Sequence, residues 1–116
     1  LDILAAKEVY IGKHYLKNQK WIAAMNRFKY VIENYQTTSH VEEALYRLVE
    51  INYKLGLLEE SKRYASVLGY NYKSSKWYEE SYRILNPKYV SRIEKIEKEK
   101  KRSKNFLIRK FRSLFD

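Results

Sequence analysis

The residue types that carry out most enzyme chemistry are scarce in this chain of 116 residues. Its histidines are His14 and His40, its aspartates are Asp2 and Asp116 at the chain ends, and it has no cysteine. A Ser-His-Asp triad, an EF-hand loop and a phospho-acceptor aspartate each need an internal aspartate. Disulfides, thiolate metal sites and cysteine nucleophiles need cysteine. We therefore predict no catalytic residue, no metal site and no cofactor.

A phosphate-binding loop and a membrane-spanning segment are also missing from the pattern. Gly12, Gly56 and Gly69 lie far apart, whereas a loop that cradles phosphate needs closely spaced glycines. No apolar run approaches the roughly 18–20 residues that a helix needs to cross a bilayer. The chain begins at Leu1 without a signal-peptide pattern, which is typical of a processed form or of a piece of a longer protein.

Basic side chains are abundant, and they are unevenly distributed. The chain carries 24 basic and 14 acidic residues, a net charge of +10. From Pro87 onward there are 11 basic and 4 acidic residues, so this tail accounts for +7 and residues 1–86 for +3. We therefore treat residues 1–86 and residues 87–116 as two parts that need separate explanations.

Apolar residues recur at helical spacing through most of residues 1–86. Residues 17–20, with Asn18 as a plausible turn residue, separate a first helix from a second, and residues 37–39 separate the second from a third. We expect Gly56 to end the third helix in a left-handed conformation, and Gly69 to end the fourth. The pattern predicts four helices arranged as two hairpins.

Serine and threonine residues mark the start of the third helix and of one further helix. Thr38 or Ser39 is a candidate cap for the third helix. Ser74 or Ser75 is expected to open a short fifth helix that stops before Pro87. This fifth helix is predicted to cap the two hairpins.

The two hairpins repeat with a period that matches the tetratricopeptide repeat, a helix pair of about 34 residues. Trp21 and Leu58, Ala24 and Ser61, and Phe28 and Ala65 are each separated by 37 positions, and the extra length falls in the loop around residues 36–40. The first hairpin has Gly12, Tyr15, Trp21, Ala24 and Phe28 at the fitting offsets. The pattern predicts an all-α fold of tetratricopeptide-like hairpins, an α-solenoid. The alternative is an unrelated four-helix array with similar core spacing.

Three segments resemble the C-terminal repeats of the BamD family, the tetratricopeptide lipoproteins of the outer-membrane β-barrel assembly machine. They are Tyr15–Phe28, with Trp21 and the Asn26-Arg27 pair, the Tyr35-Gln36-Thr37-Thr38 turn, and Glu43–Tyr53. The resemblance extends over about Ala5 to Leu85. Gln36 stands where the family usually has proline.

The resemblance implies a scaffold and not an enzyme. Family members lie on the periplasmic face of the outer membrane, held there by a lipid anchor that we expect on an N-terminal part outside this chain. Their C-terminal repeats dock on the last periplasmic domain of the barrel-inserting subunit, BamA, and other lipoproteins of the machine are further candidate partners. The resemblance implies that Arg27 pairs with an acidic residue of BamA, a task that suits a bidentate guanidinium.

The candidate partner-binding residues in the repeats are Lys20, Asn26, Arg27, Glu50 and Tyr53. Arg27 lies off the apolar face of its helix and should be exposed, and an ordinary solvated arginine is the alternative. Glu50 and Tyr53 lie on the helix that usually lines a tetratricopeptide groove, although a local salt bridge is the simpler use of Glu50. Trp21 is expected to pack within its repeat.

The tail is expected to be a long basic helical extension over residues 87–116. Its first part pairs Glu94 with Lys98 and Glu97 with Lys101 at i, i+4 spacing, which favours an exposed helix. Its end is a basic amphipathic segment, whose candidate contact residues are Leu107, Arg109, Lys110, Phe111, Arg112 and Phe115. Such a segment suits the inner leaflet of the outer membrane or the groove of an acidic partner, and packing on the protein's own body is the alternative.

Two other functions are compatible with the composition. A generic tetratricopeptide adaptor would clamp the C-terminal carboxylate of a peptide with Lys17 and Lys54, one lysine per repeat. A nucleic-acid-binding protein would use the basic tail through weak contacts that depend on salt. Residues 1–86 have no basic stripe and no nucleic-acid-binding motif, so we expect no nucleic-acid partner.

Overall fold

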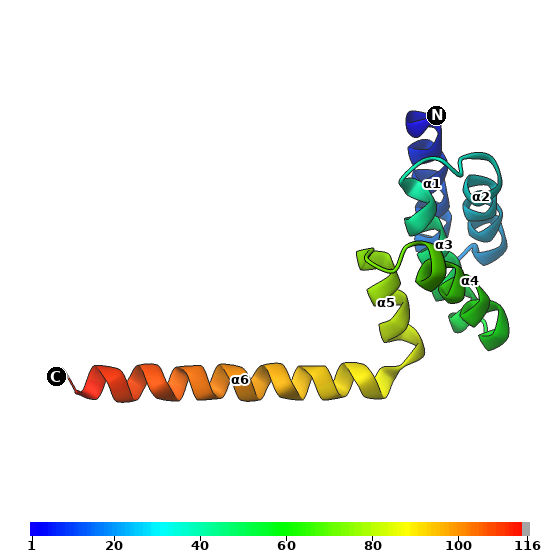
Figure 1. Cartoon of the computed structure of the whole chain (residues 1–116). Coiled ribbons are helices and arrows are strands. Elements are labelled where there is room, and N and C mark those ends of the chain that lie inside the picture. Colours follow the sequence, from blue (N-terminus) through cyan, green and yellow to red (C-terminus); the bar gives the residue numbers. More distant parts are fainter. Residues whose placement is uncertain (115–116) are drawn as a thin grey trace. The chain divides into compact units, whose positions relative to one another are not determined.

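The computed structural model describes residues 1–114, without the side chains of residues 89–93, and these residues form helices and short connections (Figure 1). The all-α prediction is confirmed. The helices are α1 (Asp2–Lys17), α2 (Trp21–Asn34), α3 (His40–Lys54), α4 (Leu58–Asn71), α5 (Lys76–Leu85) and α6 (Pro87–Ser113). They fall into two units, Leu1–Leu85 with α1 to α5, and Asn86–Asp116 with α6.

The first unit is built from helical hairpins. α1 packs against α2, and α3 packs against α4, which gives the two hairpins that the periodicity predicted. Contacts between α2 and α3 join the hairpins, and α3 also packs against α1 and α5. The first helix of each hairpin, α1 or α3, therefore lies next to the helix that opens the following repeat position, α3 or α5, as in a tetratricopeptide-like array (Figure 1).

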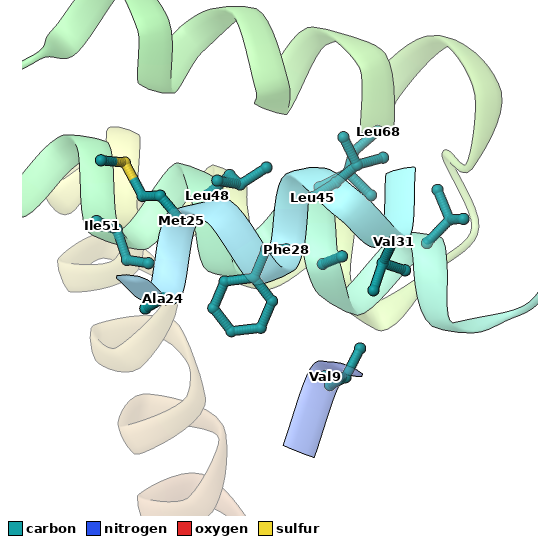
Figure 2. Packing of buried hydrophobic residues seen from close by; sticks show 11 residues of the cluster. Val9, Ala24, Met25, Phe28, Val31, Leu45, Leu48, Ile51 and Leu68 are labelled. Atoms are coloured by element: carbon teal, nitrogen blue, oxygen red, sulfur yellow. The ribbon is translucent and has the colours of Figure 1, made fainter. Parts of the chain in front are cut away.

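The core of the first unit lies between the two hairpins. Figure 2 shows Phe28 and Val31 of α2, Leu45 and Leu48 of α3, and Leu68 of α4 in this cluster. All five side chains are buried. Burial of each such side chain stabilises the fold by about 1.5–3 kcal/mol. The helices that carry the predicted binding residues are thus fixed by a shared apolar core.

The turns within the two hairpins have the same geometry, and each contains the residue that the sequence predicted, Asn18 or Gly56. Gly56 takes a left-handed conformation with φ +79°, as expected. In the first hairpin the left-handed residue is Gln19, with φ +60°, and Asn18 has φ −93°. Asn18 thus lies in the turn, as predicted, and the left-handed conformation falls on the next residue. In both turns the left-handed residue and the residue after it donate their backbone N–H groups to carbonyls of the preceding helix, at distances of 2.8–3.1 Å.

The prediction that Gly69 ends the fourth helix is wrong. α4 continues to Asn71, and the N–H of its cap residue Tyr72 donates to the carbonyl of Leu68 at 2.8 Å. Gly69 instead lets α5 approach, since a Cβ at this position would lie 3.0 Å from the ring of Tyr78. Packing between α4 and α5 therefore accounts for this glycine.

Of the two predicted caps, one is confirmed. The backbone N–H of Trp77 donates to Oγ of Ser75 at 3.2 Å, so Ser75 caps α5. Ser39 precedes α3 without a side-chain hydrogen bond to the helix, and Thr38 donates to the carbonyl of Tyr35 instead. The hydroxyl of Thr38 thus closes the preceding turn.

α6 forms the second unit as one continuous helix of 27 residues. Pro87 begins it, in the first turn where a missing N–H is tolerated. The side chains of residues 94–114 are exposed. No helix among the described residues is both long enough and apolar enough to cross a bilayer.

Candidate partner-binding surface

Arg27 of α2 forms an ion pair with Glu8 of α1. Nη1 of Arg27 lies 3.0 Å from Oε2 and 3.4 Å from Oε1 of Glu8. The Arg27 side chain is 40% exposed and the Glu8 side chain 17%. The hydrogen bond to Glu8, together with its negative charge, raises the pKa of Arg27 above the ordinary value of arginine. The cation is therefore held on α1 but remains accessible to a partner.

A small surface pocket surrounds this ion pair. Its volume is about 330 Å³, and it is lined by Glu8, Asn26, Arg27 and Tyr30. Tyr30 is partly exposed, and its ring meets the ring of Tyr35 edge to face at a centroid distance of 5.8 Å. Arginine and tyrosine, both of which line this hollow, are residue types that often anchor protein interfaces. The arrangement places a guanidinium, a group that can bind a carboxylate, at the edge of this hollow.

Glu50 lies in a different cluster, which crosses from α1 to α3. Lys13 Nζ is 2.7 Å from Oε2 of Glu43, and Arg47 bridges Glu43 at 3.3 Å and Glu50 at 3.4 Å. Tyr46 also donates to Glu50 at 3.4 Å. Glu50 therefore has the local salt bridge that its sequence context suggested, and its charge is balanced within the chain.

Aromatic rings extend this cluster to α5. The guanidinium of Arg47 lies 5.2 Å from the ring centroid of Tyr46 and 5.8 Å from that of Trp77. The two rings are themselves 5.2 Å apart. Stacking of this kind is favourable and orients the arginine. The cluster joins α1, α3 and α5, so it stabilises the helical array. Its charges are paired with one another rather than exposed as a binding site.

Lys20 and Tyr53 lie at helix ends. Lys20 is the exposed residue before α2, and Tyr53 is a partly exposed residue near the end of α3. The two ends are neighbours, since Nζ of Lys54 lies 5.6 Å from the ring centroid of Trp21. Trp21 is partly buried and packs against the core, as expected. The predicted residues thus occupy three places, and only Asn26 and Arg27 share one pocket.

Sequence reasoning did not identify Glu8 and Tyr30 as parts of this site. Glu8 and Arg27 are 19 positions apart, so no local spacing connects them. Gly12 and Phe28, two residues of the repeat pattern, were the available signal in the sequence. Their contact fixes how α1 and α2 lie against each other. Glu8 is one turn before Gly12, and Arg27 is next to Phe28, so the pairing follows from the hairpin register.

The predicted contact residues of the tail lie on exposed parts of α6. Leu107, Phe111 and Arg112 line one shallow hollow on this helix, together with Lys104 and Ile108. Arg109 and Lys110 are exposed on the same segment. Phe115 lies outside the described residues. Among residues 1–114, no three histidine, cysteine, aspartate or glutamate side chains are placed to hold a metal ion.

Comparison with known proteins places this chain in a family. Residues 1–68 match the YfiO family, described as outer membrane lipoprotein. The chain is 60% identical over 84 residues to outer membrane protein assembly factor BamD of Rickettsia prowazekii (strain Madrid E), covering 72% of this chain and 34% of the relative. It is 56% identical over 85 residues to BamD of Caulobacter vibrioides, covering 73% and 28%. BamD of Neisseria gonorrhoeae is 41% identical over 54 residues, which cover 47% and 20%.

These matches confirm several predictions made from the sequence. The chain spans about a third of the length of the curated relatives it matches, and no solved structure matches it. The relatives are named as assembly factors, which confirms that the family is not one of enzymes. The family description confirms the outer-membrane location. The chain therefore belongs to the YfiO family of outer membrane lipoproteins, the family of assembly factor BamD.

Proposed function

We propose that this chain is the docking part of a scaffold subunit in the outer-membrane β-barrel assembly machine. In this proposal it binds the last periplasmic domain of a BamA-like barrel-inserting subunit at the periplasmic face of the membrane. The observation that carries the proposal is the accessible Arg27 cation, held by Glu8 beside a pocket that Asn26 and Tyr30 help to form. An acidic side chain of the partner is the ligand that this arrangement suits.

The geometry of Arg27 supports a shared ion pair. A guanidinium is planar and has five N–H donors, whereas Glu8 engages it through Nη1. A carboxylate of the partner therefore binds alongside Glu8 and does not have to displace it. The other predicted residues have lesser roles in this proposal. Asn26 and Tyr30 contact the partner around the ion pair, Lys20 and Tyr53 contact it at the neighbouring helix ends, and Glu50 supports the array from within.

Substitution of Arg27 tests the proposal directly. The protein with Arg27→Glu should bind the last periplasmic domain of its BamA partner at least about tenfold more weakly, because repulsion then replaces attraction at a central contact. Binding is measured by isothermal titration calorimetry, after circular dichroism has shown that the helical content is unchanged.

Arg63→Glu is the matched control for this experiment. Arg63 is an exposed arginine of α4 whose ion pair is with Glu60, one turn away on the same helix, at 3.2 Å. It undergoes the same change of charge away from the proposed site, and its effect on affinity should stay within about twofold. Equal losses in the two variants, or unchanged affinity in both, would remove Arg27 from the interface. No binding of this domain by the unaltered chain would overturn the docking proposal.

A further inference from the structure

The end of α6 carries an exposed apolar stripe. Leu107, Ile108, Phe111 and Leu114 follow each other at the i, i+1, i+4, i+7 spacing, which places them within about 120° of the helix circumference. All four are exposed in the second unit of the chain. A row of large apolar residues on one side of a helix is typical of a surface that binds something.

Basic residues border this stripe. Between Lys100 and Leu114 the sequence has seven basic residues and no acidic one. Lys110 lies on one side of the stripe and Arg112 on the other, each about 40° beyond its nearest apolar neighbour. Arg112 and Lys104 line the same hollow as three of the stripe residues. Long basic side chains at these edges can reach outward to anionic groups while the stripe is buried.

We propose that residues 100–114 of α6 bind the surface of an anionic phospholipid bilayer. The helix lies in the plane of the interface, with Leu107, Ile108, Phe111 and Leu114 among the upper acyl chains and the basic residues at the phosphate groups. Charge complementarity selects this ligand, because the segment joins an apolar stripe to an uninterrupted positive charge. A membrane is also the surface beside which a member of an outer membrane lipoprotein family is located.

This contact is separate from the proposed docking at Arg27. It uses the second unit of the chain, whereas docking uses α1 and α2 of the first. Through this contact, residues of α6 attach the protein to the bilayer reversibly, with a strength that depends on ionic strength. Each basic residue at an anionic surface strengthens binding by about fivefold, so salt should weaken the attachment strongly.

Vesicle co-sedimentation of the full chain tests the proposal. One set of vesicles contains three parts phosphatidylcholine and one part phosphatidylglycerol, and the other set contains phosphatidylcholine alone. We expect binding to the first set at low salt, a large loss of binding at high salt, and little binding to the second set. No binding to the anionic vesicles, or equal binding to both sets, overturns the proposal.

Two phenylalanines of α6 provide a matched pair of variants. Phe106 and Phe111 are each 63% exposed, but Phe106 lies about 140° around the helix from Phe111 and outside the stripe. Phe111→Ser should weaken vesicle binding by about tenfold or more, because an aromatic ring no longer enters the bilayer. Phe106→Ser should change it by less than about twofold. Equal effects of the two variants would contradict the assignment of the stripe.

A charge variant and a measurement of self-association complete the test. Lys110→Gln combined with Arg112→Gln should weaken binding by about twentyfold, whereas Lys95→Gln combined with Lys98→Gln, in the acidic part of α6, should have a much smaller effect. Analytical ultracentrifugation reports whether the stripe instead joins two copies of the chain. A dimer that Phe111→Ser dissociates, without vesicle binding by the unaltered chain, would overturn the proposal in favour of self-association.

Discussion

Gly12 of α1 lies directly against the ring of Phe28 of α2. A Cβ built at Gly12 would be 2.7 Å from both Cε1 and Cζ of that ring, closer than a carbon atom can pack. Phe28 is fully buried in the core, so its ring has no free space to move into. This contact sets the distance and the register between the helices that carry Glu8 and Arg27.

Gly12→Ala should therefore destabilise the protein by about 1–2 kcal/mol, since overpacking outweighs the better helix propensity of alanine. Gly69→Ala is the control, because its Cβ would meet the partly exposed ring of Tyr78 at 3.0 Å, and that ring can shift. Its free energy of unfolding should stay within about 0.5 kcal/mol of the unaltered protein. Urea denaturation followed by circular dichroism measures both. A Gly12→Ala variant as stable as the parent would show that α1 and α2 can separate freely.

Gln19→Gly should stabilise the protein by about 0.5–1 kcal/mol. Gln19 has φ +60°, a conformation that glycine adopts without the strain that a Cβ introduces. Asn18→Gly is the control, because Asn18 has φ −93° and gains nothing from glycine. The midpoint of thermal unfolding should rise for the first variant and fall or stay constant for the second. The opposite order would mean that Asn18, not Gln19, governs the turn.

Glu8→Gln should leave stability nearly unchanged and weaken docking on the partner several-fold. The ion pair is accessible to water on the arginine side, so it contributes little to folding, but it fixes the direction of the guanidinium. In the Arg27→Glu background the same substitution should cause no further loss of affinity, because no cation is left to orient. Calorimetric titration of the unaltered chain, the two single variants and the double variant gives the coupling free energy between Glu8 and Arg27 in partner binding. Additive losses would show that Glu8 acts independently of Arg27.

Glu43→Gln should destabilise the first unit by about 1–3 kcal/mol. Glu43 is 13% exposed and pairs with Lys13 of α1 and Arg47 of α3, so its loss removes the charge that joins the two helices and leaves the part-buried Arg47 with Glu50 alone. Glu59→Gln is the matched control, because Glu59 is 89% exposed and its ion pair with Lys62 spans 3.7 Å. That variant should unfold as the parent does. Chemical denaturation compares the two, and equal stabilities would show that the cluster across α1 and α3 is energetically neutral.

Much of the fold was accessible from the sequence because the apolar spacing and the 37-residue period constrain the same helices. Trp21 and Leu58 begin α2 and α4, and Gly56 closes the turn between α3 and α4 as its conformational freedom suggested. Gly69 was misleading because a glycine that permits close packing and a glycine that ends a helix look alike in one sequence. The Asn-Tyr pair that ends α2 at Asn34-Tyr35 recurs at Asn71-Tyr72, and this recurrence indicates the true end of α4, since both tyrosines cap their helices.

The candidate site was less accessible for a physical reason. Arg27 stands out as a cation on the polar side of an amphipathic helix, but its accessibility and direction depend on Glu8, a residue of another helix. Glu50 and Tyr53 were grouped with Arg27 because of their position in the repeat. The side-chain contacts in the structure separate them, and such contacts follow from packing rather than from spacing.

The helix starts and ends of α2 recur in α4 at a spacing of 37 residues, and this has a consequence for how the array can change in length. α2 and α4 have the same number of residues, are preceded by residues of similar backbone angles, and end at tyrosines with φ −126° and −138°. A segment of 37 residues removed from or added to this region would therefore recreate the same junction at its new border. The array is therefore modular, because duplication or deletion of one 37-residue repeat leaves the neighbouring helices with surfaces that already pack together.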